Sequence, residues 1–277
     1  MKLTYDNYKA RRYKISGFTL IELLIAVLLA AIVTSAAMGI YVAQHKQLIV
    51  QDEVTDMQAN IRAAAVELTS KIRMAGYKVP EGIPKLEASD TNPDTITITY
   101  DSGGFEDVII EHAMPQPSAE LRCDGHDISA LHDGDWVFIY DPTADSGEFF
   151  LVTEVQVAAA HIQHNTMPLS RLYPAGSYVI MMNQFKYYID NSNPDHPNLI
   201  CWTHRTGPQV FAENITDLNF QYILANGQVV DVFLDEDMVR EVVLTIDART
   251  DKRDLEFHTE YRTRGLDTRV KVRNLGR

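Results

Sequence analysis

The sequence predicts an α+β fold in which a long N-terminal helix, first transmembrane and then amphipathic, packs on a β-rich, mainly antiparallel domain. Three observations predict this fold. Residues 18–43 are almost uniformly apolar, residues 44–76 carry apolar positions at helical spacing, and residues 77–277 contain many short segments of strand type. Residues 1–17, which precede the apolar stretch, are expected to form a separate basic leader.

Charge is distributed unevenly along the chain, whose formal net charge is −13. Residues 1–17 hold five basic groups and one acid, and removing them leaves 20 basic and 37 acidic residues in the rest of the chain. Such an acidic body excludes nucleic acid as an expected partner, because binding to phosphates needs clustered lysine and arginine. The six charged leader residues are Lys2, Asp6, Lys9, Arg11, Arg12 and Lys14.

The apolar stretch of residues 18–43 predicts one transmembrane helix. It is 26 residues long and contains a single charge, Glu22, whereas a helix needs about 20 residues to cross the hydrocarbon core. A helix in a soluble core would show a polar stripe at a period of 3.6 residues, and none is present. Because lysine and arginine are enriched on cytoplasmic flanks, the leader is expected to stay in the cytoplasm while the β-rich domain crosses.

The boundary between leader and apolar stretch reads Ser16-Gly17-Phe18-Thr19-Leu20-Ile21-Glu22. Together with its flanks, it closely resembles the prepilin cleavage and methylation motif of type IV pilins and of type II secretion pseudopilins. The resemblance implies that a membrane peptidase cuts after Gly17 and methylates Phe18. The alternative interpretation is a signal-anchor helix with a chance Gly-Phe pair. A conventional secretory signal would instead place its cleavage site after the apolar stretch.

The resemblance also implies a role for Glu22 and a set of partners. In that family the corresponding acid is thought to attract the N-terminal amine of a neighbouring subunit, which implies Glu22 as an assembly contact. An acid that merely reaches the lipid headgroups is the alternative. The implied partners are prepilin peptidase, other minor and major pilins, and the inner-membrane assembly platform. The implied location is the inner membrane, spanned once, and then a pilus or pseudopilus.

The helix is expected to continue beyond the membrane over residues 44–76. Good helix formers run on without a proline until Pro80, and Gly76 is a natural C-terminal cap. Gly39 could bend the helix. Major pilins often have a proline near that point, so its absence favours a minor pilin or a pseudopilin. The stripe expected to face the β-rich domain is Val50, Val54, Met57, Ile61, Leu68 and Ile72, with Ala64 or Ala65 between.

Strand signals dominate the rest of the chain, after a linker loop expected over residues 78–92 that is rich in proline, glycine and glutamate. The best hairpin prediction joins residues 215–224 to 229–233, because the intervening Asn226-Gly227 pair tolerates the positive φ angles of a tight turn. The other expected strands cover residues 95–100, 136–140, 149–157, 178–189, 199–203, 239–248, 255–263 and 268–273.

Four segments outside the N-terminus carry a second, weaker resemblance, to PilW-type minor pilins. The end of the helix looks like that family's Ile-Arg-x-Ala-Gly-Tyr segment, and three later segments fit its closing pattern. With the N-terminal motif, this resemblance touches both ends of the chain and covers about half of it. The segments are Leu68-Thr69-Ser70-Lys71-Ile72-Arg73-Met74-Ala75-Gly76-Tyr77, then residues 214–222 and 239–244, then Val272-Arg273-Asn274-Leu275.

Catalytic chemistry is not expected, because no constellation of acid, base or nucleophile is apparent. His161 and His164 lie three residues apart in a segment without an adjacent carboxylate, and are interpreted as surface residues. Two acidic loops could hold calcium but lack the glycine and spacing of a known calcium loop, so solvated loops are favoured. The sequence therefore predicts no enzyme, no cofactor and no metal. The acidic loops contain Asp141, Asp145 and Glu148, and Asp231, Asp235, Glu236 and Asp237.

Two cysteines leave room for one bridge at most. Cys123 and His126 form one Cys-x-x-His pair, and Cys201 and His204 form another, which together offer the four ligands of a tetrahedral zinc site. In an exported domain a disulfide between Cys123 and Cys201 is the ordinary outcome, and it is the favoured interpretation. Two separate thiols and a zinc site are the alternatives.

The function expected from these features is structural, that of a minor pilin of a type IV pilus that takes part in assembly or in an initiating or tip complex. A pseudopilin of a type II secretion system and a filament-tip adhesin are the alternatives. An anchored enzyme is a fourth hypothesis, without an identifiable catalytic group.

Overall fold

The computed structural model describes residues 17–101, 103, 108–166, 168–254 and 260–276. Most of the predicted basic leader, and residues 255–259 of one predicted strand, lie outside the described residues. The chain divides into two compact units, Met1–Asp52 and Glu53–Arg277, and each is described by itself below.

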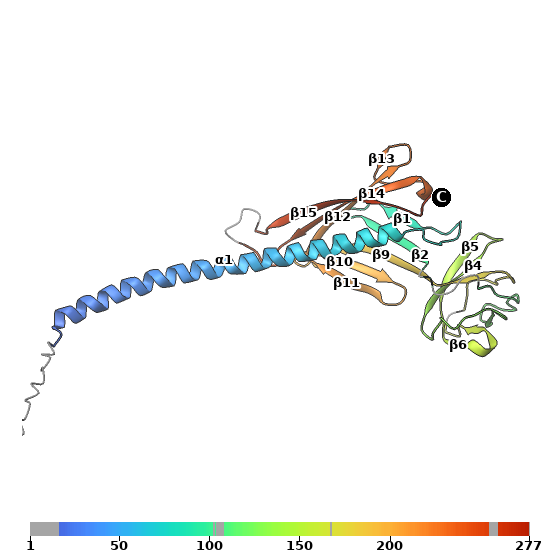
Figure 1. Cartoon of the computed structure of the whole chain (residues 1–277), viewed down its shortest axis with the longest axis horizontal. Helices are drawn as coiled ribbons and strands as arrows, with labels where there is room; N and C mark the ends of the chain where they lie inside the picture. Colours follow the sequence, from blue (N-terminus) through green and yellow to red (C-terminus); the bar gives the residue numbers. More distant parts are fainter. Residues whose placement is uncertain (1–16, 102, 104–107, 167, 255–259, 277) are drawn as a thin grey trace, which may run out of the picture. The chain divides into compact units, whose positions relative to one another are not determined.

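The first unit is dominated by the N-terminal part of helix α1 (Leu20–Met74), drawn in blue in Figure 1. Its most apolar window of 18 residues has a mean hydropathy of 2.6, and none of that window is buried within the chain. By length and composition this helix can cross a membrane. Gly39, which could bend the helix, lies inside the continuous helix, and a side chain there would meet no other atom within 4 Å.

In the second unit, the C-terminal part of α1 buries one face against the β-strands. The predicted stripe is confirmed at its C-terminal positions, while Val54 is partly buried. The helix ends at Met74, because Gly76 adopts a φ of +76° and its N–H donates to Thr99 O. The buried residues of α1 are Met57, Ile61, Ala64, Ala65, Leu68 and Ile72.

Two antiparallel sheets pack with this helix face. The five-stranded sheet has the order β1 (Leu86–Ser89), β2 (Thr95–Asp101), β9 (Met182–Asp190), β10 (Asn198–Thr203) and β11 (Gly207–Glu213). The four-stranded sheet has the order β13 (Val229–Val230), β12 (Ile215–Leu224), β14 (Val239–Arg249) and β15 (Thr263–Lys271).

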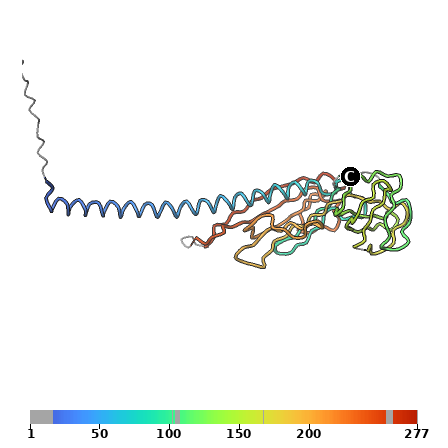
Figure 2. The backbone as a smooth tube through the Cα atoms, turned by 90° about the horizontal axis from the view of Figure 1, so that it is seen from below, coloured from blue at the N-terminus to red at the C-terminus, as the bar shows by residue number. Residues whose placement is uncertain are grey.

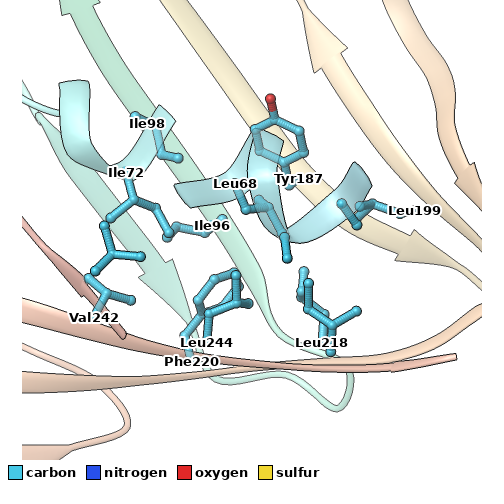
Figure 3. Packing of buried hydrophobic residues seen from close by; sticks show 14 of the residues in the cluster. Leu68, Ile72, Ile96, Ile98, Tyr187, Leu199, Leu218, Phe220, Val242 and Leu244 are labelled. Atoms are coloured by element: carbon cyan, nitrogen blue, oxygen red, sulfur yellow. The ribbon is translucent and has the colours of Figure 1, made fainter. Parts of the chain in front are cut away.

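The main hydrophobic core lies where helix and sheets meet. Figure 3 shows Leu68 and Ile72 of α1 close to Ile96 of β2 and to Phe220 and Leu244 of the four-stranded sheet, and all five side chains are at most 1% exposed. Strands β2, β12 and β14 contribute alternate residues to this core, as half-buried sheets require. The structure thus confirms the predicted α+β layout of a long helix with a mainly antiparallel sheet domain.

A separate lobe is formed by short strands inserted between β2 and β9, and it gathers at one end of the unit in both Figure 1 and Figure 2. One three-stranded sheet has the order β3, β7, β6, and another has the order β5, β4, β8. The lobe has its own hydrophobic cluster. Its elements are β3 (Leu121–Arg122), β4 (Trp136–Asp141), β5 (Ser146–Leu151), β6 (Glu154–Gln156), the 3₁₀ helix η1 (Val157–Ala159), β7 (His161–Gln163) and β8 (Tyr178–Ile180).

Several strand predictions need correction. The predicted linker of residues 78–92 contains β1, and the expected strands 149–157 and 178–189 are each divided into two. Of the strand expected over 255–263, the described residues 260–262 are not strand and residue 263 begins β15, which also covers residues 268–271 of the last expected strand. Strands β3, β7 and β11 were not expected. The hairpin prediction is confirmed, since Ile223 pairs with Val229 across the Asn226-Gly227 turn.

Candidate functional site

The N-terminus of α1 is closed by a reciprocal pair of hydrogen bonds between Thr19 and Glu22. The backbone N–H and the hydroxyl of Thr19 both donate to Glu22 Oε2 at 2.9 Å, and the backbone N–H of Glu22 donates to Thr19 Oγ1 at 3.3 Å. Thr19 directly precedes the first helical residue, so Glu22 occupies the third position of the helix. This arrangement is a capping box, which satisfies backbone N–H groups that a helix end leaves without partners.

The Glu22 carboxylate therefore has a fixed position near the start of an apolar helix. A negative charge is favourable there, because the helix dipole places partial positive charge at its N-terminus. All hydrogen bonds to the side chain involve Oε2, and no lysine, arginine or histidine of the described residues lies within ion-pair distance. A cation that neutralises this carboxylate must therefore come from outside the described part of the chain.

The peptide between Gly17 and Phe18 is accessible. Both residues are exposed, and the Phe18 side chain is 85% exposed. A Cβ atom added to Gly17 would meet nothing within 4 Å, and its backbone is not in the left-handed region that favours glycine. Gly76 differs, because its φ is +76° and a Cβ there would lie 2.9 Å from the Leu275 side chain. The fold requires glycine at position 76, and it imposes no such requirement at position 17.

Among the described residues, the apolar surface of the first unit is not buried by other parts of the chain. Phe18, Leu20 and the apolar side chains that follow are at least 43% exposed as far as Val42. Thr34 interrupts this surface only weakly, because its hydroxyl donates to Ala30 O at 2.7 Å within the helix. Such a surface needs either lipid or other helices around it.

The sequence motif contained these residues, but the capping role of Thr19 was not predicted from it. The signal was present as Thr-x-x-Glu directly before an apolar run, which is the sequence form of a capping box. The structure places Gly17, Phe18, Thr19 and Glu22 together because they are sequence neighbours. No residue of the second unit is needed to form this site.

The favoured disulfide between Cys123 and Cys201 is not present in this structure, where both cysteines are free. Cys123 is buried in the cluster of the separate lobe, whereas Cys201 on β10 packs against the main core. The proposed zinc ligands are also apart, because His126 Nε2 contacts Glu111 Oε1 at 3.0 Å while His204 stacks on Phe149 with ring centroids 4.2 Å apart. The two Cys-x-x-His pairs therefore make separate contacts and do not come together as one set of zinc ligands.

The other candidate ligands are engaged in the fold. Asp141 Oδ2 accepts from Arg171 Nη2 at 3.1 Å, and the Glu236 carboxylate accepts from the backbone N–H groups of Lys85 and Leu86. His164 was expected at the surface and is 1% exposed, with its Nε2 2.7 Å from Ala119 O.

His161 also differs from expectation, since two carboxylates lie beside it. Its Nε2 is 3.1 Å from Asp124 Oδ1, and its Nδ1 is 3.5 Å from Glu120 Oε1. Within the described residues, no group of three or more His, Cys, Asp or Glu side chains is arranged to hold a metal ion.

Thiol labelling without reductant is expected to find two free cysteines in the unfolded chain and almost none in the folded one. Burial raises the pKa of the Cys123 thiol to about 12, with Asp124 and Glu111 adding to the effect, and burial also raises the pKa of Cys201. The reactive thiolate is therefore scarce at neutral pH. Labelling of the native protein should accelerate as pH rises. Failure to label either thiol in denaturant, before reductant is added, would restore the disulfide.

Comparison with known families supports the importance of the N-terminal site. Residues 12–38 match the family model described as the prokaryotic N-terminal methylation motif. This match includes the Gly17-Phe18 peptide, the capping box and most of the apolar stretch, and it ends before the β-rich unit. A search of curated proteins finds no match to the chain.

Proposed function

We propose that this type IV pilin-like protein is a minor pilin, which prepilin peptidase processes and which then enters a type IV pilus or its initiating or tip complex. The observation that carries the proposal is the N-terminal site. An accessible Gly17-Phe18 peptide and a capped Glu22 lie directly before an apolar helix that is not buried in its own chain, within a matched methylation motif. We further propose that the role is structural and not enzymatic.

Three features of this site have no explanation within the chain, and all three fit processing and assembly. Gly17 is not required by its backbone conformation or by its neighbours. The Glu22 carboxylate has no cation partner among the described residues. Cleavage after Gly17 would create an amine at Phe18, and the amine of a neighbouring subunit would supply that partner in a setting of low dielectric constant. The exposed apolar helix would pack on the helices of other subunits.

The choice of a minor pilin of PilW type is supported by two segments that resemble that family. The helix end, Ile72-Arg73-Met74-Ala75-Gly76-Tyr77, and the segment Val272-Arg273-Asn274-Leu275 lie nearly 200 residues apart in the sequence. They contact each other in the second unit, where Asn274 Nδ2 donates to Ala75 O at 3.4 Å. A Cβ on Gly76 would also lie 3.1 Å from Asn274 O. The resembling segments thus form one local structure that closes the helix end.

Filament composition and piliation test this proposal. The chain, carrying a C-terminal epitope, would be expressed in its own host, and sheared surface filaments would be probed for it. We expect the epitope at a low ratio to the main subunit, and we expect deletion of the gene to reduce piliation while secretion of folded proteins continues. Loss of secretion with normal piliation would instead identify a pseudopilin, and no effect on either process would contradict both assignments.

A further inference from the structure

An apolar groove runs along the second unit between α1 and the edge strand β15. One side of it comes from an exposed face of the helix and the residues just after it, where Val66 is 65% exposed, Met74 37% and Tyr77 39%. Leu266 and Thr268 of β15 form the opposite side. These exposed apolar side chains lie outside the core, so the groove offers apolar contact to another molecule.

Three arginines border this groove in a domain that is otherwise acidic. Arg62 and Arg73 come from α1, and Arg273 follows β15. No carboxylate of the described residues lies within ion-pair distance of any of them. The acid among the lining residues, Asp267, accepts a hydrogen bond from Thr245 Oγ1 at 2.8 Å. The groove therefore fits a segment that carries both apolar and acidic side chains.

The strand beside the groove has an open edge. Strand β15 is the last of the four-stranded sheet, and among the described residues it pairs with β14 alone. Half of the backbone N–H and C=O groups of an edge strand point away from the sheet, where they can bind an added strand. An extended segment lying along β15 could form those bonds while its side chains enter the groove.

The opposite edge of the same sheet carries a segment of the required composition. Strand β13 and the residues after it read Val229-Val230-Asp231-Val232-Phe233-Leu234-Asp235. Within this acidic edge segment, residues 229–235, the side chains of Val229, Val232 and Leu234 are 56%, 47% and fully exposed. Asp231 and Asp235 are also exposed. The two edges of the sheet are therefore complementary. One is bordered by arginines and the other carries aspartates, and both have exposed apolar side chains.

The directions of β13 and β15, and their alignment across the sheet, allow β13 of one copy to pair with β15 of another. Strands β13 and β14 are both antiparallel to β12, and β15 is antiparallel to β14, so β13 and β15 run in opposite directions. Tyr222 pairs with both Val230 and Val242, and Val242 pairs with Val270. Val230 is therefore level with Val270 across the sheet. A second copy beside the first would extend the sheet in antiparallel order.

We propose that the acidic edge segment of one copy of this chain docks along β15 and in the arginine-bordered groove of a neighbouring copy. The two surfaces are different, so the contact is head-to-tail, and in a pair one copy keeps a free groove while the other keeps a free edge segment. This contact belongs to the second unit and does not depend on the assignment as a minor pilin.

Disulfide cross-linking between two variants in liposomes tests the contact. Val66→Cys places a thiol in the groove and Leu234→Cys places one on the acidic edge segment, and neither exposed side chain belongs to the core. The full-length variants would be reconstituted together in one population of liposomes and oxidised. We expect a disulfide-linked dimer in the mixed sample and not in either variant alone. The unsubstituted chain, which retains Cys123 and Cys201, provides the background.

Charge reversal separates the proposed contact from chance collision. Arg73→Glu in the Val66→Cys chain is expected to lower the dimer yield about tenfold, because like charges would then face each other. Arg205→Glu is the matched control, since this exposed arginine lies in the turn between β10 and β11, away from the four-stranded sheet. Equal yields for the two reversals, a dimer from Val66→Cys alone, or no dimer in the mixture would each overturn the proposal.

Discussion

A chain with valine in place of Gly17 is expected to keep its leader and to accumulate as an unprocessed membrane protein. Nothing in the structure opposes the added side chain, because a Cβ at this position meets no atom within 4 Å and the backbone is not left-handed. The variant should therefore fold and insert normally. The block would arise in the peptidase, whose pocket we expect to be closed to any residue larger than glycine.

Intact mass measurement of protein purified from its own membrane decides this outcome. The unsubstituted protein should begin at Phe18 and be one methyl group heavier than the mass of residues 18–277. The Gly17→Val variant should keep residues 1–17. Gly39→Val is the matched control, because Gly39 also lies in open space and is outside the motif. Release of the leader from Gly17→Val at the normal rate would contradict the assignment of the cleavage site.

The helix could be predicted from the sequence because its determinants are local. The sequence predicts a helix over residues 18–43 that continues over residues 44–76, and α1 runs over Leu20–Met74. Thr19 caps its start through Glu22, and Gly76 ends it with a positive φ. The buried stripe follows from apolar spacing alone. The same is true of the β12–β13 hairpin, whose Asn-Gly turn is a local signal.

The first strand and the separate lobe could not be predicted, because their determinants are distant in the sequence. Strand β1 lies in a segment rich in proline and glycine, and the N–H of its first residue, Leu86, donates to the carboxylate of Glu236, which is 150 residues away. Strands of two or three residues, such as β3 and β7, are too short to show an alternating pattern. The pairing of Cys123 and Cys201 was expected from an exported location, which says nothing of distance, and the fold places the two cysteines in different clusters.

The N-terminal site could be predicted from the sequence, whereas the arginine-bordered groove could not. Gly17, Phe18 and Glu22 are sequence neighbours, so the motif identifies them directly. The groove bordered by Arg62, Arg73 and Arg273 joins residues from both ends of the second unit. Its formation depends on β15 lying beside α1, and no local pattern of the sequence predicts that arrangement.

Replacement of Glu22 by leucine is expected to leave membrane insertion and leader removal intact and to abolish incorporation into filaments. The carboxylate is held by Thr19 at the start of the helix and has no cation partner among the described residues. Intramembrane acids are costly and usually have both a partner and a function. The amine created at Phe18 of a neighbouring subunit is the partner we propose. Without that attraction, helices with nearly featureless apolar surfaces would lose their axial register.

Glu22→Gln separates the charge of this side chain from its capping role. Glutamine can complete a capping box as glutamate does, so this variant keeps the start of α1 while removing the negative charge. Thr19→Ala does the reverse, since it removes the cap and keeps the carboxylate. Sheared filaments would be probed for each variant, with leader removal measured in parallel. We expect both Glu22 variants to be absent from filaments and Thr19→Ala to remain. If Glu22→Gln entered filaments as the unsubstituted chain does, the carboxylate would serve the helix start alone, and the proposed contact with a neighbouring amine would be wrong.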